Sequence, residues 1–195
     1  MLIIRHGQDE PNFRGGWSEK GLTPLGIFQS YKLSNYLLSI GYNNSKIISS
    51  DLPRAKETAL ILSKHLNSDL KLSKNWREVN SGLLSGMNKD ESDIIYPNMY
   101  LEKLSIDEKY PEGESPREFY NRVVHAFNKL VLKINNCEKT ILVTHGGTIM
   151  VLFHYLKGLD WINDRKYIKV EKCSINYVEY ENSKWQIIRE NHYNY

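Results

Sequence analysis

Short apolar runs alternate with longer amphipathic segments along most of this chain. Four runs, at residues 2–4, 46–49, 70–72 and 140–144, have the length and composition of strands. Near the end of the chain, residues 174–180 and 185–189 alternate apolar and polar positions on either side of Glu-Asn-Ser, which predicts a β-hairpin at a sheet edge. The pattern predicts an α/β fold, a three-layer α/β/α sandwich with a mostly parallel central sheet.

Three of the segments between these strands begin with helix-start signals. Thr23-Pro24 places a hydroxyl N-cap before a proline at the first helical position. Ser50-Asp51-Leu52-Pro53 predicts a second capped start directly after a strand. Ser115-Pro116-Arg117-Glu118 combines a capping box with the same proline placement, and an apolar stripe extends that helix to about residue 135.

Residues from about 83 to 111 interrupt the alternation with a polar, tyrosine-rich stretch. We interpret residues 1–195 as a single domain in which this stretch is an insertion, a lid that covers one end of the sheet and shapes a substrate pocket. The alternative is a surface excursion with no role in function. The sequence alone leaves both interpretations open.

Composition narrows the classes of partner. The 195 residues carry a net charge of only +3, with 41% hydrophobic and 25% charged residues, as in an ordinary globular domain. We therefore expect neither a nucleic acid partner nor a membrane partner, and no signal peptide. Cys137 and Cys173 have no metal-type spacing, so free thiols in a cytoplasmic protein are expected.

The candidate chemistry lies where the predicted strands end. Arg5-His6-Gly7 follows the first strand and Thr144-His145-Gly146-Gly147 follows a later one, while Arg54 lies in the first turn of the helix after strand 46–49. Ligands of open α/β sheets bind at the carboxyl ends of the strands. Guanidinium groups match phosphate oxygens, and the N–H groups of a helix N-terminus also favour anions. Phosphate is therefore the ligand that these residues favour.

These segments resemble the histidine phosphatase superfamily, also called phosphoglycerate mutase-like. The resemblance covers most of the chain and rests on motifs in the family's order: Arg5-His6-Gly7 with Asn12, Leu22-Thr23-Pro24-Leu25-Gly26 with Gln29, Ser49-Ser50-Asp51-Leu52-Pro53-Arg54-Ala55 with Thr58-Ala59, Arg77-Glu78 with Gly82 and Gly86, Gly113-Glu114-Ser115, and Thr144-His145-Gly146-Gly147. It implies a phosphoglycerate mutase-like fold.

The resemblance also assigns roles. His6 is expected to attack phosphorus and form a phosphohistidine, and Glu78 to act as general acid and base. Arg5, Arg54 and His145 are expected to stabilise the transferred phosphoryl group. The phosphate- and substrate-binding residues are expected to be Arg5, Asn12, Gly16, Arg54, His145 and Gly146. No metal and no cofactor are expected.

Simpler interpretations exist for each residue taken alone. Either arginine could be a surface ion-pair partner, Glu78 could be solvated, His145 could cap a helix and Asn12 could cap a turn. Without the family resemblance, a metal site built from His6 and His145 would also stay open, although no carboxylate spacing supports it. The catalytic interpretation is favoured because the others would all have to coincide.

Family membership leaves the reaction open. The favoured function is a phosphomonoesterase acting on a small-molecule phosphate ester. The alternatives are a cofactor-dependent phosphoglycerate mutase and a protein-binding relative without catalysis. Relative to mutases, the chain has Ser81 where they carry a tyrosine after the acid and Gly15 where they carry a threonine, and the 83–111 stretch has no adjacent arginine pair.

One further departure concerns Asp9, which stands where the family usually carries Thr or Ser. Its carboxylate near the phosphate loop is expected either to raise the pKa of a histidine or to repel highly charged substrates. The identity of the phosphomonoester, and whether the protein is a monomer or a homodimer, stay open at this point.

Overall fold

The computed structural model describes residues 1–134, 138–165, 167–182 and 184–195. Within them, one six-stranded sheet has the order β3-β2-β4-β1-β5-β6. The strands are β1 (Leu2–Arg5), β2 (Lys46–Ser49), β3 (Asp69–Leu72), β4 (Thr140–Thr144), β5 (Ile175–Glu181) and β6 (Lys184–His192). The first four are parallel, and β5 and β6 form an antiparallel hairpin at one edge. The predicted mostly parallel sheet is confirmed.

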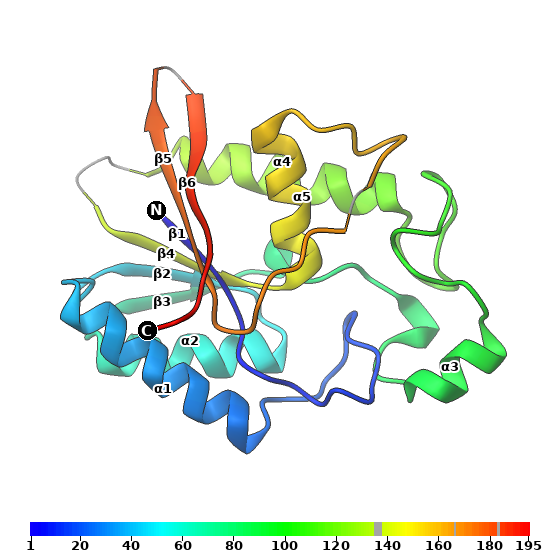
Figure 1. Cartoon of the computed structure of the whole chain (residues 1–195), viewed down its shortest axis with the longest axis horizontal. Coiled ribbons are helices and arrows are strands. Elements are labelled where there is room, and N and C mark those ends of the chain that lie inside the picture. The colour runs from blue at the N-terminus through cyan, green and yellow to red at the C-terminus, as the bar shows by residue number, and fades with distance from the viewer. Residues whose placement is uncertain (135–137, 166, 183) are drawn as a thin grey trace.

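Helices cover both faces of this sheet (Figure 1). The helices are α1 (Pro24–Ser39), α2 (Pro53–His65), α3 (Lys89–Ile95), α4 (Pro116–Val131) and α5 (Gly146–Lys157), with the short 3-10 turns η1 (Lys74–Trp76) and η2 (Gly82–Leu84). Helices α1 and α2 pack on one face, and α4 and α5 on the other. Successive residues of β1 point to opposite cores: Leu2 and Ile4 pack with Leu33 of α1, and Ile3 packs with Phe119 of α4. Burial on both faces explains the continuous apolar sequence of β1.

The helix starts follow their sequence signals with one correction. Thr23 caps α1, and Ser115 and Glu118 form the capping box of α4. Helix α2 begins at Pro53, but its N-cap is Leu52 without a side-chain cap, because the Ser50 hydroxyl lies 2.8 Å from His145 Nε2 instead. Helix α4 ends at Val131, earlier than predicted. The predicted end at residue 135, and Cys137, lie outside the described residues.

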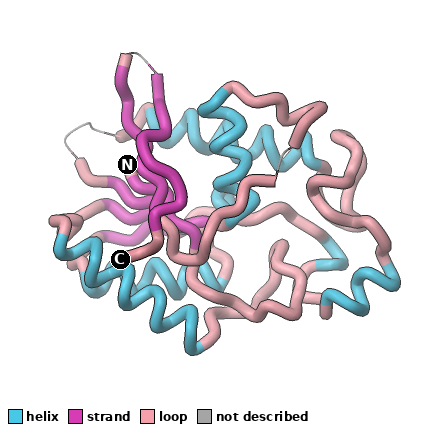
Figure 2. The backbone as a smooth tube through the Cα atoms, viewed as in Figure 1, coloured by secondary structure: helices cyan, strands magenta, loops and turns pink. Residues whose placement is uncertain are grey.

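The stretch at residues 83–111 forms η2, α3 and connecting turns at one side of the sheet, as Figures 1 and 2 show. Its backbone bonds to the loop that follows β1: Lys89 N donates to Asn12 O (2.9 Å), Arg14 N to Met87 O (2.8 Å) and Gly86 N to Arg14 O (3.0 Å). The stretch therefore holds the loop at residues 12–14. Closure of this stretch as a lid stays a prediction. None of the described helices is long and apolar enough to cross a membrane.

Candidate active site

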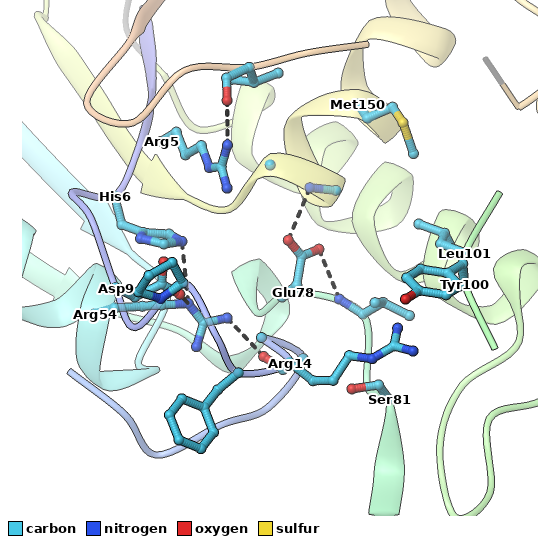
Figure 3. Close-up of a pocket in the computed structure, with 18 of the residues that line it drawn as sticks. Arg5, His6, Asp9, Arg14, Arg54, Glu78, Ser81, Tyr100, Leu101 and Met150 are labelled. Atoms are coloured by element: carbon cyan, nitrogen blue, oxygen red, sulfur yellow. Dashed lines mark hydrogen bonds and ion pairs between the residues drawn. The ribbon is translucent and has the colours of Figure 1, made fainter. Parts of the chain in front are cut away.

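A cleft of about 470 Å³ opens at the carboxyl ends of β1, β2 and β4. Its inner end, here called the inner cleft, is formed by Arg5, His6, Arg54 and Glu78 together with the buried His145 behind them. Its outer walls, here called the outer cleft, are formed by Lys89, Tyr100, Leu101, Glu102, Tyr110, Tyr167 and Ile168. In Figure 3 the labelled Arg5, His6 and Arg54 lie on one side of Glu78, and Tyr100 and Leu101 lie on the other.

His6 is held in one tautomer at the end of β1. Its Nδ1 lies 2.7 Å from the carbonyl oxygen of Gly7, so Nδ1 carries the proton and donates it. Nε2 is then unprotonated, and its lone pair accepts a hydrogen bond from Arg54 Nε at 3.2 Å. Burial, followed by the charges of Lys172 and Arg54, lowers the pKa of His6 well below 6.5. A neutral imidazole with an available Nε2 is a nucleophile at neutral pH.

The two arginines reach the inner cleft from different elements. Arg54, in the first turn of α2, is only 2% exposed, and its Nη2 donates to the carbonyl oxygen of Gly16 at 2.8 Å. Arg5, at the end of β1, bonds through Nη1 to the carbonyl oxygen of Val170. Its buried Nε has no hydrogen-bond partner among the described residues. An unsatisfied buried N–H of a guanidinium is costly unless a ligand accepts from it, so it points to an anion bound there.

His145 ends β4 and lies directly behind His6. The two ring centroids are 5.0 Å apart, and His145 is completely buried. Its Nε2 is bonded to Ser50, whereas its Nδ1 has no partner among the described residues. Burial, then the charges of Arg54 and Arg5, lowers the pKa of His145 well below 6.5. His145 occupies the N-cap position of α5, but its imidazole makes no capping hydrogen bond. The interpretation of this side chain as a helix cap is therefore wrong.

Glu78 occupies the centre of the cleft at a fixed angle. Its Oε1 accepts from its neighbour Val79 N at 3.0 Å, and its Oε2 accepts from Gly147 N, in the first turn of α5, at 3.0 Å. A Cβ at position 147 would lie 2.3 Å from Glu78 Oε1, so only glycine lets the carboxylate approach this closely. Glu78 therefore faces the space in front of His6 with its orientation set by backbone donors.

A second layer of side chains holds the backbone of Glu78. Arg122 on α4 donates from Nη2 to the carbonyl oxygen of Glu78 (3.0 Å) and is itself paired with Glu114 (2.7 Å). The Trp17 indole N–H donates to the same carbonyl oxygen at 2.9 Å. Sequence reasoning did not single out Arg122 or Trp17. Their sequence signal was weak, because an arginine on an amphipathic helix or a tryptophan in a loop belongs to no motif that indicates a functional role.

Of the other predicted binding residues, the two glycines line the cleft and Asn12 does not. Gly16 and Gly146 line the cleft, and a Cβ at Gly146 would contact the Arg5 guanidinium at 3.3 Å. Asn12 is exposed on the turn after β1 and is not among the described residues that line the cleft. The structure therefore brings together Arg5, His6, Arg54, Glu78, His145, Gly16 and Gly146. It does not bring Asn12 to them, because the backbone of Asn12 is bonded to Lys89 of α3 instead.

Asp9 enters the cleft between two cations. Its carboxylate lies 3.4 Å from Arg54 Nε through Oδ2 and bonds to Lys172 Nζ through Oδ1. The pKa of His6 is lowered, so the expected raising effect of Asp9 on a histidine does not prevail. Lys172, just before β5, is the cleft residue that sequence reasoning missed, since a lone lysine outside any motif carries no signal.

The arrangement suits a phosphoryl group more than a metal ion. Within the described part of the chain, no group of three or more His, Cys, Asp or Glu side chains is placed to hold a metal ion. The inner cleft instead combines a neutral nucleophilic nitrogen, two guanidinium groups, the N-terminal N–H groups of α5 and one carboxylate. Such a set can accept a phosphoryl group on nitrogen, stabilise its equatorial oxygens and move a proton at the leaving oxygen.

The fold and this site define an α/β protein whose cleft is suited to an anion next to the neutral imidazole of His6. Residues 1–192 match the family model described as histidine phosphatase superfamily (branch 1). The chain belongs to this superfamily.

Two kinds of relatives accompany the family match. The chain is 31% identical over 195 residues to the protein of Proteus mirabilis named "Probable phosphoglycerate mutase GpmB", covering 95% of this chain and 86% of that protein. It also shares its fold with the mycobacterial glucosyl-3-phosphoglycerate phosphatase (TM-score 0.81, 22% identity, 98% of each chain). A variant of the Entamoeba histolytica phosphoserine phosphatase in complex with phosphoserine is similar as well (TM-score 0.78, 19% identity, 99% of this chain and 96% of that chain).

Proposed function

We propose that this protein is a metal-independent phosphomonoesterase that hydrolyses a small-molecule phosphate ester through a phosphohistidine on His6. The observation that carries the proposal is the His6 tautomer, with Nδ1 bonded to Gly7 O and Nε2 available toward the cleft. The buried unpartnered Arg5 Nε and His145 Nδ1 support it, because phosphate oxygens would satisfy the Arg5 donor and, in its Nδ1-protonated tautomer, His145.

In the first step, His6 Nε2 attacks phosphorus in line with the ester oxygen. The N–P bond forms while the P–O bond to the leaving group breaks, and Glu78 gives its proton to the departing oxygen. Arg5 and Arg54 stabilise the charge on the equatorial oxygens, with His145 as a further donor. The incoming phosphate replaces the hydrogen bond that Arg54 Nε donates to His6 in the free protein.

In the second step, water attacks the phosphohistidine. Glu78 takes a proton from this water, the N–P bond breaks, and inorganic phosphate leaves with His6 neutral again. The low pKa of His6 favours its return to the neutral, nucleophilic state.

The mutase reaction is the second candidate, because the Proteus mirabilis relative carries that name. A mutase must hold a second anionic group of its substrate next to the phosphate. The three cleft cations beyond Arg5 and Arg54 are already engaged: Arg14 with Asp93, Lys89 with Pro11 O, and Lys172 with Asp9. Arg14 and Lys172 each already have a carboxylate partner, which limits the positive charge left for a second anionic group and favours the phosphatase.

The test is a panel of phosphomonoesters assayed with the wild-type protein and His6→Ala, in the presence and absence of a chelator. We expect hydrolysis that resists chelation and falls at least about 10³-fold in His6→Ala, and an acid-labile phosphoenzyme that the variant lacks. His125→Ala, an exposed histidine of α4, is the matched control and should keep full activity. Hydrolysis that survives His6→Ala would refute the mechanism. Bisphosphate-stimulated interconversion of phosphoglycerates would instead identify a mutase.

A further inference from the structure

Lys172 is a mostly buried cation at the phosphate end of the cleft. It lines the cleft, its side chain is 17% exposed, and its ammonium group bonds to the Asp9 carboxylate. It comes from the segment before β5, whereas Asp9 comes from the loop after β1. The pair thus joins two segments that are far apart in the sequence, next to the other charged residues of the inner cleft.

The backbone next to Lys172 is bonded to the nucleophile segment. Cys173 N donates to the carbonyl oxygens of Arg5 (3.1 Å) and His6 (3.3 Å), and Arg5 N donates to Ser174 O (3.3 Å). Cys173 adopts φ 58°, a left-handed conformation that non-glycine residues enter at a cost. The chain therefore turns sharply here, and the position of Lys172 relative to His6 is fixed by hydrogen bonds of the two residues that follow it.

The electrostatic surroundings of Lys172 are unusual for a structural lysine. Burial and the charge of Arg5 lower its pKa to about 8, even though Asp9 acts in the opposite direction. Asp9 in turn has two cations to neutralise, Arg54 and Lys172. Asp9 is thus the carboxylate that contacts both Arg54 and Lys172, while Glu78 and Glu19 also act on Arg54, and a cluster of three cations, Arg5, Arg54 and Lys172, surrounds the place for an anion.

We propose that Lys172 is a phosphate-binding residue of this cleft and that Asp9 is its internal counter-ion, which competes with the phosphate for Lys172 and Arg54. The proposal rests on the phosphatase function and adds to it a specificity-determining pair. In the empty cleft the ammonium group is bonded to Asp9; when a dianionic phosphate enters, Lys172 contacts it, and the Asp9 carboxylate limits the total attraction.

The consequence is that the two halves of one ion pair act in opposite directions. Loss of Lys172 removes an attraction for the phosphate, whereas loss of the Asp9 charge removes a repulsion and releases two cations. A purely structural ion pair behaves differently, because either substitution leaves a buried partner uncompensated and both weaken the protein in the same direction. With Asp9 neutral, the cleft should also accept substrates that carry a second anionic group, which the wild type binds poorly.

The experiment measures binding of inorganic phosphate by calorimetry at pH 7, so that it does not depend on turnover. We expect Lys172→Met to weaken phosphate binding ~10-fold to 100-fold and Asp9→Asn to tighten it by ~3-fold to 10-fold. Lys172→Arg, which keeps the charge, should stay within about 3-fold of wild type. Lys169→Met is the matched control, because Lys169 is on the same segment and paired with Glu171, yet is exposed and absent from the described cleft lining.

A pH series separates binding from folding. Above the pH at which inorganic phosphate is fully dianionic, wild-type affinity for phosphate should fall as Lys172 loses its proton, and Lys172→Met should lose this fall. The charged and titratable groups that face Lys172 are Arg5, His6, Asp9, Arg54, His145 and Cys173. Both histidines are neutral in this range because their pKa values lie well below 6.5, and burial raises the pKa of Cys173 to about 12.

The proposal is overturned if Lys172→Met and Lys172→Arg both bind phosphate like wild type, or if Asp9→Asn and Lys172→Met change affinity in the same direction. Circular dichroism identifies a misfolded variant, and Asp9→Asn then carries the test with Lys172→Arg. Failure of the phosphatase proposal looks different: phosphate binding follows the expected order, but none of the phosphomonoesters is hydrolysed in a His6-dependent way.

Discussion

The inner and outer clefts share one cavity but are built in different ways. The inner cleft takes most of its side chains from the carboxyl ends of parallel strands and from a helix start, where His6, Arg54 and His145 are at most 2% exposed; Glu78 comes from the loop after η1. The outer cleft is formed mostly by connecting segments, and the exposure of its side chains extends from 4% at Tyr110 to 69% at Tyr167. His6 and Glu78 of the inner cleft are oriented by hydrogen bonds to backbone groups, whereas Tyr100 of the outer cleft is held by the side chains of Asp93 and Arg14.

This difference separates chemistry from substrate choice. Catalytic groups must be positioned to within fractions of an ångström, which rigid sheet and helix ends provide. Residues that recognise the remainder of a substrate tolerate looser placement and occur on loops. We therefore expect inner substitutions to lower turnover for every phosphomonoester, and outer substitutions to change the ranking among them.

The largest effect should follow from removing the proton-transfer group. Glu78→Gln keeps the shape of the side chain, and its amide oxygen can still accept one of the two backbone hydrogen bonds. Because a general acid and base contributes about 10²–10⁴-fold, we expect kcat to fall by that factor with little change in KM. Glu102→Gln, a carboxyl of the outer cleft, is the matched control. Equal losses in the two variants would contradict the division between the clefts.

The same division explains what the sequence could reveal. The four parallel strands, the hairpin and the two N-caps that are followed by proline were predictable because burial on two faces and helix starts leave local signals, as at Ile3-Ile4 and Thr23-Pro24. His6 and His145 were predictable because each follows a strand directly, and Arg54 because it lies in the first turn of the helix after β2. The N-cap of α2 was predicted wrongly, since Ser50 is committed to a partner 95 residues away.

Other residues depended on contacts that no local pattern records. Lys172 meets Asp9 across 163 residues, and Arg122 reaches the Glu78 carbonyl oxygen across 44. Asn12 failed to reach the cleft because the segment at residues 83–111 bonds to its backbone. Tertiary pairing decided each of these positions.

A pH titration of stability should report on the inner cleft, with a smaller contribution from the partly buried His192, whose pKa burial also lowers. His6 and His145 stay neutral in the folded protein because burial lowers their pKa, whereas in the unfolded chain they take up protons near pH 6.5. The unfolded state therefore binds more protons below pH 6.5, so stability is present above that pH and is lost as the pH falls through it, by up to about 1.4 kcal/mol per pH unit for each histidine.

Urea unfolding between pH 5.5 and 7.5 measures this slope. His6→Asn should reduce it, and exposed His125→Asn should leave it unchanged. No histidine is among the described residues of the outer cleft, so substitutions there should not alter the slope. A slope that survives in both His6→Asn and His145→Asn would show that these imidazoles are not held neutral.

A smaller effect is expected from displacing Glu78 without removing it. In Gly147→Ala the new Cβ would lie 2.3 Å from Glu78 Oε1, so the carboxylate has to move. Misplacement by about 1 Å can cost on the order of 10²-fold, and we expect kcat to fall by about 10-fold to 100-fold while phosphate affinity is kept. In Gly15→Ala the nearest atom is Arg54 Nη2 at 3.6 Å, an ordinary contact, so this control should be nearly unchanged. Loss of phosphate binding in Gly147→Ala would show that the substitution disturbs more than the acid.

The smallest effect should come from the outer cleft and should differ between substrates. The Tyr100 ring stacks against Arg14, whose Cζ lies 4.0 Å from the ring centroid, and the Tyr100 hydroxyl donates a hydrogen bond to Asp93. Tyr100 therefore forms a wall of the cleft and does not reach His6. In Tyr100→Leu we expect the ratio of kcat/KM between an aryl phosphate and a small alkyl phosphate to change by about 3-fold to 10-fold, because one aromatic contact contributes about 0.5–1.5 kcal/mol. The alcohol or phenol of the substrate has left before the phosphohistidine is hydrolysed, so the rate of that hydrolysis in single-turnover experiments should stay constant. Tyr180→Leu, on the exposed hairpin, should leave the ratio unchanged.

If Tyr100→Leu slows both substrates equally and slows phosphohistidine breakdown as well, the outer cleft also positions the reacting groups, and the two clefts work as one unit.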